Sequence, residues 1–141
     1  MFRVAVVVVA LWLVGIAAAS AEIESFQSPS KGISCAYDGG SDDARPSITC
    51  EVANFVGALP PRPKDCELDW IPRASISTSN SKAFIGSCAG DTIALPTAPV
   101  LSYGTRFVRG PLRCASATTG FACTNGRGIG FRISKRSLTR I

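Results

Sequence analysis

Alternating apolar and polar positions predict a hairpin in the first third of the chain. In KGISCAYD (residues 31–38) and SITCEV (residues 47–52), alternate residues are apolar or cysteine. This period of two is typical of strands that bury one face. Placing Cys35 opposite Cys50 brings the apolar residues of both segments to the same side, and the intervening GGSDDARP is rich in turn-forming residues. The pattern predicts an antiparallel hairpin closed by a disulfide.

A second hairpin is predicted in LRCASATTGFACTN, residues 112–125. With Cys114 opposite Cys123, residues 117–120 form a four-residue loop, which is a common hairpin length. Gly120, the last residue of that loop, can adopt the positive φ that this position often needs. The two hairpins look alike, which fits either an internal duplication or simply the easiest way to bridge a hairpin. We favour the second interpretation.

The N-terminus has the three parts of a secretory signal peptide. Arg3 precedes an unbroken apolar run, residues 4–19, and a small-x-small site follows at residues 19–21. The alternative is a membrane anchor, but the sixteen-residue run is shorter than the roughly 18–20 residues that span a bilayer. We therefore expect a signal peptide at 1–21 and a single secreted or periplasmic domain at 22–141, with no transmembrane segment after cleavage.

The cysteine pattern predicts three disulfides and no metal site. An even number of cysteines in a small exported domain is typical of a disulfide framework. The two hairpins supply two pairs, and exclusion pairs the remaining two cysteines. A metal site is disfavoured because the chain has no C-x-x-C spacing and no histidine, and we expect no cofactor. The cysteines are Cys35, Cys50, Cys66, Cys88, Cys114 and Cys123.

The rest of the chain indicates further short strands. Pro60, Pro61 and Pro63 make LPPRPKDC a stiff loop, and the segments at 83–88 and 92–104 supply short strands. No stretch keeps a helical repeat for ten residues. The fold class is therefore mainly β, a small antiparallel sandwich or barrel held by three disulfides.

The glycine-rich stretch CTNGRGIGFRISKRS, residues 123–137, invites a phosphate-loop interpretation. Such loops open a helix, whose free N–H groups hold the anion. Here the glycines lead instead into FRIS, whose alternation is that of a strand, and no Lys-Ser/Thr ending follows. We interpret the glycines as a tight bend or bulge.

Several short segments also carry a resemblance. FQSPS, CELDW, CAGDT, LSYG and CTN followed by G-x-GF occur in this order between Phe26 and about Ser137. Together with the cysteine spacing, they resemble a family of small secreted bacterial domains of unknown function. The resemblance implies an exported, disulfide-linked domain with no assigned activity. Ile129 stands where that family usually has histidine, and Lys31-Gly32 where it tends to have Gly-Asn, so a histidine-based role cannot operate here.

Charge is distributed unevenly along the mature chain. Residues 22–91 contain ten acidic and six basic residues, a balance of −4, whereas residues 92–141 contain eight basic residues and no acidic one. Such asymmetry concerns partners and solubility rather than fold. It predicts a basic C-terminal face for an anionic cell-envelope polymer or another exported protein; the alternative is a merely solvated face. The candidate anion-binding residues are Arg109, Arg113, Arg127, Arg132, Lys135 and Arg136.

An enzyme is not expected. The chain lacks histidine, the commonest general base, and its cysteines are expected to be oxidised. A weak glycan hydrolase using Glu67, Asp69 or Asp91 is a less favoured alternative. Nucleic acid is a poor candidate, since the few aromatic residues are needed for the core. The main alternative to a non-catalytic envelope-binding domain is an inhibitor of a protease or lysozyme that presents the loop from Leu59 to Lys64.

Overall fold

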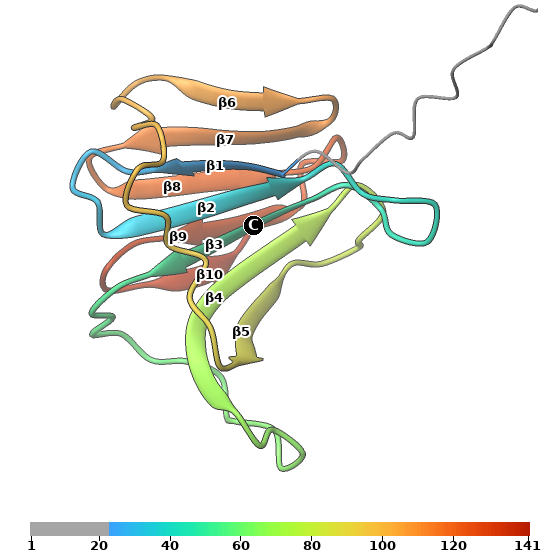
Figure 1. Cartoon of the computed structure of the whole chain (residues 1–141), viewed down its shortest axis with the longest axis vertical. Coiled ribbons are helices and arrows are strands. Elements are labelled where there is room, and N and C mark those ends of the chain that lie inside the picture. The colour runs from blue at the N-terminus through green and yellow to red at the C-terminus, as the bar shows by residue number, and fades with distance from the viewer. Residues whose placement is uncertain (1–22) are drawn as a thin grey trace, which may run out of the picture.

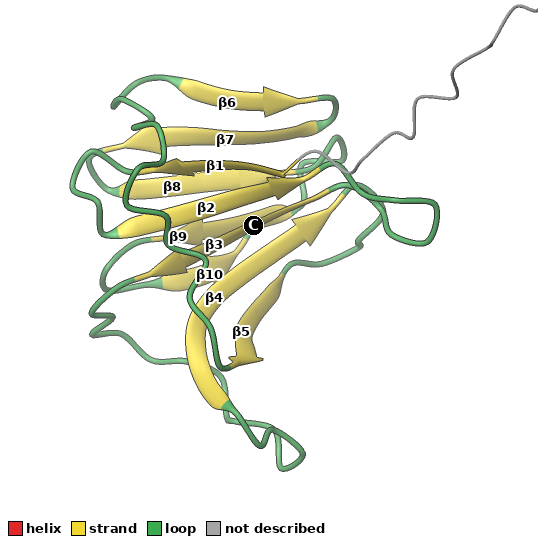
Figure 2. Ribbon diagram, in the orientation of Figure 1, coloured by secondary structure: helices red, strands yellow, loops and turns green. Residues whose placement is uncertain are grey.

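The computed structural model describes residues 23–141 as a sandwich of two five-stranded antiparallel sheets (Figure 1). The described residues contain no helix (Figure 2). They therefore include no helix that could cross a membrane. The predicted signal peptide lies outside them. The N-terminal sheet has the order β1-β2-β3-β4-β5 and the C-terminal sheet the order β10-β9-β8-β7-β6. The strands are β1 (Ile23–Gln27), β2 (Ile33–Asp38), β3 (Ser47–Val52), β4 (Asp69–Ser77), β5 (Phe84–Ala89), β6 (Arg106–Arg109), β7 (Leu112–Ala117), β8 (Gly120–Thr124), β9 (Gly130–Ile133) and β10 (Leu138–Arg140).

The predicted mainly β class and the three disulfides are confirmed. Cys35 pairs with Cys50 across β2 and β3, and Cys114 pairs with Cys123 across β7 and β8, each in the predicted register. The pair left by exclusion is also present, between Cys66 and Cys88. The architecture is a sandwich rather than a barrel, because each sheet keeps two open edges.

Two details differ from the expectation. The β7–β8 loop has two residues rather than four, because Ala117 still pairs with Gly120, whose φ of 122° extends the ladder. A Cβ at Gly120 would overlap the carbonyl of Ile133 on β9, so only glycine permits this close approach. Residues 92–104 contain no strand; they form an irregular segment with one isolated bridge, between Gln27 and Val100.

The core repeats the same arrangement in both sheets. In each sheet, the first strand supplies a phenylalanine and the next two strands supply a bridged cysteine pair in the same cross-strand row: Phe26, Cys35 and Cys50 in one, and Phe107, Cys114 and Cys123 in the other. The rows face each other, with the rings of Phe26 and Phe107 stacked at 4.4 Å and the Sγ atoms of Cys50 and Cys123 3.8 Å apart. The two sheets therefore present matching rows to each other across the core.

The crossover segment (residues 90–105) joins the sheets by passing over the outer face of the N-terminal sheet (Figure 1). The buried side chain of Gln27 donates to the carbonyls of Pro96 and Ala98. Its backbone N–H donates to the Pro99 carbonyl, and its carbonyl accepts from the N–H of Leu101. Further along the sheet, Glu51 accepts from Arg73 on β4 and from Thr92 of the crossover. These hydrogen bonds, rather than a strand ladder, hold the irregular crossover segment in place.

Candidate functional site

The charge asymmetry of the sequence becomes a difference between the two sheets. The strands of the N-terminal sheet carry four acidic residues, Glu24, Asp38, Glu51 and Asp69. The strands of the C-terminal sheet carry no acidic residue and five basic ones, which are Arg106, Arg109, Arg113, Arg132 and Arg140. Any anion-binding surface is therefore best sought on the C-terminal sheet.

The outer face of the C-terminal sheet carries three of these arginines, and we call this surface the arginine face. Arg106, Arg113 and Arg132 are exposed, and each alternates with residues that point into the core. Arg106 and Arg132 lie in one cross-strand row with two alanines between them, so their backbones are about 14 Å apart at normal strand spacing. Most outward neighbours are small residues: Ala115, Ala117, Ala122, Thr124, Gly130 and Thr139. The exception is Val108, which lies opposite Arg113 and is 48% exposed. The result is a sheet face on which Arg106 and Arg132 lie at opposite ends of one cross-strand row.

Two of the six predicted anion-binding residues have structural partners instead. Arg109, on the edge strand β6, forms an ion pair with Glu24 of β1 and lies 4.8 Å above the Phe107 ring. Arg127 donates to the carbonyls of Ser79 and Asn80 in the β4–β5 turn. Both arginines connect the two sheets, so their side chains are held by contacts within the fold.

The other four predicted residues occupy two adjoining places. Arg113 and Arg132 belong to the arginine face, whereas Lys135 and Arg136 lie on the β9–β10 turn at one end of the sandwich. A shallow depression of about 250 Å³ on the outer face is lined by Arg132 together with Thr139. The basic residues thus extend from the sheet to its end.

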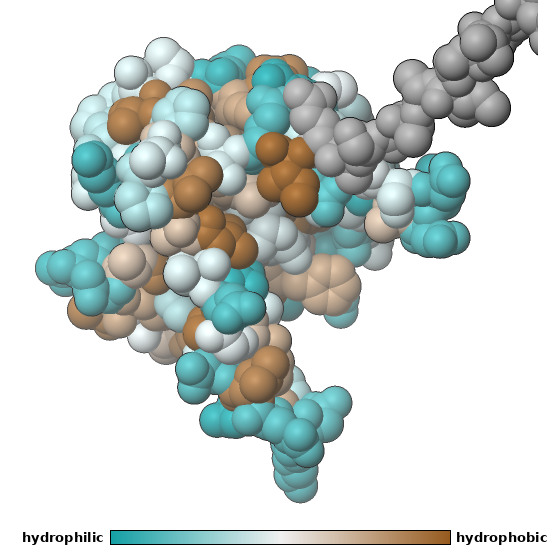
Figure 3. All heavy atoms as spheres, viewed as in Figure 1, coloured by the Kyte–Doolittle hydropathy of each residue, from teal (hydrophilic) through white to brown (hydrophobic). Residues whose placement is uncertain are grey.

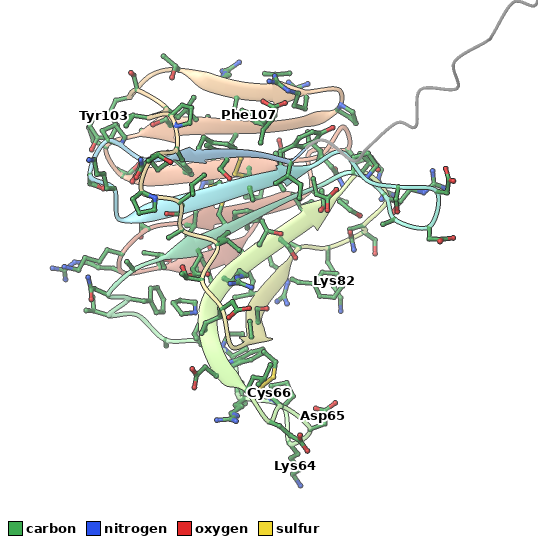
Figure 4. All side chains as sticks on the ribbon, in the orientation of Figure 1. Lys64, Asp65, Cys66, Lys82, Tyr103 and Phe107 are labelled. Atoms are coloured by element: carbon green, nitrogen blue, oxygen red, sulfur yellow. A yellow bond between two sulfur atoms is a disulfide. The ribbon has the colours of Figure 1, made fainter. Side chains whose placement is uncertain are left out.

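That end of the sandwich contains a cleft of about 570 Å³, which we call the turn cleft. The turns β1–β2, β7–β8 and β9–β10 border it, together with the start of the loop after β3 and the end of the crossover. Figure 4 shows Tyr103 at this end of the molecule. No lining residue is acidic; the polar and basic ones are Ser28, Ser30, Asn54, Tyr103, Thr118, Thr119, Ser134, Lys135 and Arg136.

The basic turn of the cleft is anchored from two sides. The backbone N–H of Val56 donates to the carbonyl of Lys135 at 3.0 Å. Within the turn, the Ser134 hydroxyl accepts from the N–H groups of Arg136 and Ser137. Gly57 lies so close to the Arg136 carbonyl that a Cβ there would overlap it. The backbone is held, while the side chains of Lys135 and Arg136 make no hydrogen bond or ion pair within residues 23–141.

Little in the local sequence pattern points to the turn cleft. Its hydroxyl and amide residues lie in five separate loops. Ser28 and Ser30 belong to the FQSPS segment and Tyr103 to LSYG, but neither segment has an assigned role. Pairing of the strands into sheets brings together residues 28–32, 53–54 and 134–136. Local sequence patterns do not reveal this proximity. The one available signal was the pair of cations at the end of the glycine-rich stretch.

The glycine-rich stretch itself is a bend. Asn125 is buried, and its side-chain oxygen accepts from the N–H groups of Arg127 and Ile129. Gly128 has a φ of 74°, and a Cβ at Gly130 would overlap the carbonyl of Cys123. The glycines allow a tight approach of two strands, as the sequence suggested. The side chain of Ile129 packs against the core.

The proline-rich loop between β3 and β4 projects from the sandwich. Its tip is labelled by Lys64 and Asp65 in Figure 4, and Figure 3 shows hydrophilic residues covering it. The Arg62 guanidinium donates to the carbonyls of Cys66 and Leu68, which braces the loop internally. The N–H of Cys66 donates to the Pro63 carbonyl, so Lys64 lies within a turn. An inhibitor role for this loop stays a prediction.

The loop is also fixed at its base by aromatic packing. The indole N–H of Trp70 donates to the Pro60 carbonyl at 2.9 Å. Its ring lies against Gly86, whose φ is 83°. The carboxylate candidates lie in the same region: Glu67, Asp69 and Asp91 are exposed, and the Asp91 carbonyl accepts from Arg73. A glycan hydrolase role stays a prediction.

One sulfur cluster resembles a metal site by distance alone. The sulfur atoms of Cys50, Cys114 and Cys123 lie within 4.8 Å of one another in the core. All three are in disulfides, and a thiolate rather than a disulfide is the usual metal ligand. The cluster is part of the packed core.

Comparison with known proteins gives a family but no activity. The model of a family of unknown function, DUF6636, matches residues 5–140. This match confirms the resemblance to a domain of unknown function. No curated protein and no solved structure matches the chain.

Proposed function

The chain belongs to this family of unknown function, and we propose that it is a non-catalytic exported domain that binds an anionic polymer of the cell envelope. The arginine face is the proposed binding surface. The observation that carries the proposal is that three exposed arginines share one sheet face whose strands contain no acidic residue. The strands of this sheet supply no carboxylate that would lower the positive potential of the face.

The spacing of the arginines favours a polymer over a small anion. Arg106 and Arg132 are about 14 Å apart, which exceeds the Debye length of about 8 Å at physiological ionic strength. Arg106 and Arg132 can therefore each meet a separate negative group. An extended chain with repeated phosphates or carboxylates provides such groups, and the small residues between the arginines let it lie close to the sheet.

A location outside the cytoplasm is part of the proposal. Three disulfides in a domain of this size are typical of an oxidising compartment. Anionic polymers are common constituents of cell envelopes, so compartment and surface agree. A protein partner with an acidic surface is the alternative to a polymer.

Retention on immobilised polymer tests the proposal. The probes are poly(glycerol phosphate) and polygalacturonate, with the mature protein applied at about 50 mM salt. If three arginines each contribute about 0.7 to the salt slope, retention should weaken about 20-fold between 50 and 200 mM salt. Replacing Arg113 and Arg132 by glutamate should abolish retention and leave the melting temperature within a few degrees of the wild type.

A charge-matched control separates a specific surface from net charge. Arg45 and Lys82 are exposed on loops that contribute no residue to the arginine face. The double variant Arg45→Glu, Lys82→Glu makes the same change in net charge and should be retained like the wild type. Two results contradict the proposal. One is an equal loss of retention in both double variants. The other is unchanged retention of the Arg113→Glu, Arg132→Glu variant.

A further inference from the structure

The turn cleft offers unengaged polar groups on a rigid frame. Ser28, Ser30 and Ser134 use their hydroxyls to hold their own loops. The remaining polar side chains of the cleft make no hydrogen bond or ion pair within the described chain, and these are Asn54, Tyr103, Thr118, Thr119, Lys135 and Arg136. Two cations, two hydroxyls, an amide and a phenol thus surround one opening. A volume of about 570 Å³ lies in the range of small-molecule sites.

The backbone around the cleft is conformationally unusual. Lys31 and Asn54 have φ values of 59° and 52°, and they are the two non-glycine residues with positive φ among residues 23–141. Both lie in loops that border the cleft, and these loops are joined where the N–H of Ala53 donates to the Gly32 carbonyl at 2.9 Å. Strained backbone tends to occur at binding sites, where the surrounding structure enforces it.

The chemistry of the lining selects a class of ligand. Lys135 and Arg136 suit a carboxylate or phosphate, and the basic turn is already held in place by Val56. Asn54, Thr118 and Thr119 can both donate and accept, as sugar hydroxyls require. Tyr103 is 48% exposed, so its ring is available to the apolar face of a pyranose.

We propose that the turn cleft binds an anionic sugar, such as a uronic acid or a sugar phosphate, at the end of a glycan chain. The anionic group lies between Lys135 and Arg136, and the ring lies on Tyr103. The proposed sugar site depends only on the geometry of the cleft. The path of the rest of the glycan chain rests on the proposed function. The cleft and the depression beside Arg132 share Ala117, Thr119, Gly120 and Ser134, so a chain that ends in the cleft can continue onto the arginine face.

NMR titration of the mature, disulfide-bonded protein tests this proposal. The probes are galacturonate, galactose 1-phosphate, neutral galactose and inorganic phosphate, each followed by amide shifts. We expect saturable shifts at Gly32, Thr118 and Arg136 with at least one of the anionic sugars, with a Kd of about 1 mM for ligands of this size. The stronger of the two anionic sugars identifies the anionic group. Neutral galactose and inorganic phosphate should bind at least about tenfold more weakly.

Variants distinguish a sugar site from a simple ion site. Lys135→Gln with Arg136→Gln should weaken the anionic sugar at least about tenfold, while Arg45→Gln with Lys82→Gln should leave it unchanged. Tyr103→Ala should weaken binding several-fold, and Tyr103→Phe, which keeps the ring, should not. Equal affinity for inorganic phosphate and sugar phosphate, or no saturable shift with either anionic sugar, overturns the proposal.

The test is independent of the proposed function. A single sugar reaches only the cleft, so glutamate at Arg113 and Arg132 should leave the titration unchanged even though it abolishes polymer retention. Loss of polymer retention with intact sugar binding supports both proposals. Failure of the sugar titration with intact retention overturns the cleft and leaves the arginine face.

Discussion

Glycine in place of Lys31 is expected to make the domain more stable. Lys31 has a φ of 59°, and a left-handed conformation costs a residue with a Cβ roughly 1–2 kcal/mol. Glycine avoids this cost, but it also gives the unfolded chain more freedom, which lowers stability by about 0.4–1 kcal/mol. The difference is a gain of about 0.5–1 kcal/mol in the free energy of unfolding. For a domain of this size that corresponds to about 2–4 °C in Tm.

Thermal and urea unfolding of the disulfide-bonded protein, followed by circular dichroism, measures the gain. Lys31→Ala is the matched control, because it removes the charge and keeps the strained φ. Asn54→Gly is a second control, since asparagine tolerates φ near 52° better than lysine tolerates a similar value. We expect the Lys31→Gly variant to be the most stable of these proteins.

Two results would refute the reasoning. Equal stability of Lys31→Gly and Lys31→Ala would mean that the backbone conformation carries no cost. A gain in both variants would mean that the lysine charge, rather than φ, is unfavourable. Either result would also remove backbone strain at Lys31 from the arguments for the turn cleft as a binding site.

Three further predictions concern the framework. Replacing Cys114 and Cys123 by serine opens a bridge between residues nine apart and should cost about 3 kcal/mol of stability in urea unfolding; a loss under 1 kcal/mol would contradict this. Gly86→Ala should destabilise the domain by about 2 kcal/mol or more and change Trp70 fluorescence, because the added methyl overlaps the indole at a φ of 83°; unaltered emission would count against this packing. Gln27→Ala removes two bonds to the crossover, so limited proteolysis should cut residues 92–100 faster, whereas an unchanged rate would show that other contacts hold the segment.

The hairpins could be predicted because their determinants are local. Directly opposed cysteines in two alternating segments fix the register of a hairpin, and the loop between them is short. The crossover could not be predicted in the same way. Its apolar residues suggested strands, but Pro96 and Pro99 interrupt the pattern. What holds it is Gln27, which is about 70 residues away in sequence.

The candidate site was predicted less well, for a similar reason. The C-terminal charge excess falls in the part of the chain that forms one sheet, residues 106–140, but anion binding by its basic residues stays a prediction. The sequence could not separate engaged from unengaged cations. Arg109 meets Glu24 across 85 positions, and Arg127 meets carbonyls in the β4–β5 turn. Only the paired sheets bring these groups together.

All three disulfides join residues within the same half of the chain, and none links the two sheets. Cutting the crossover would therefore give two fragments, each with its own disulfides, held together without a covalent link like the subunits of a heterodimer. Their union would depend on concentration, and dilution would separate them.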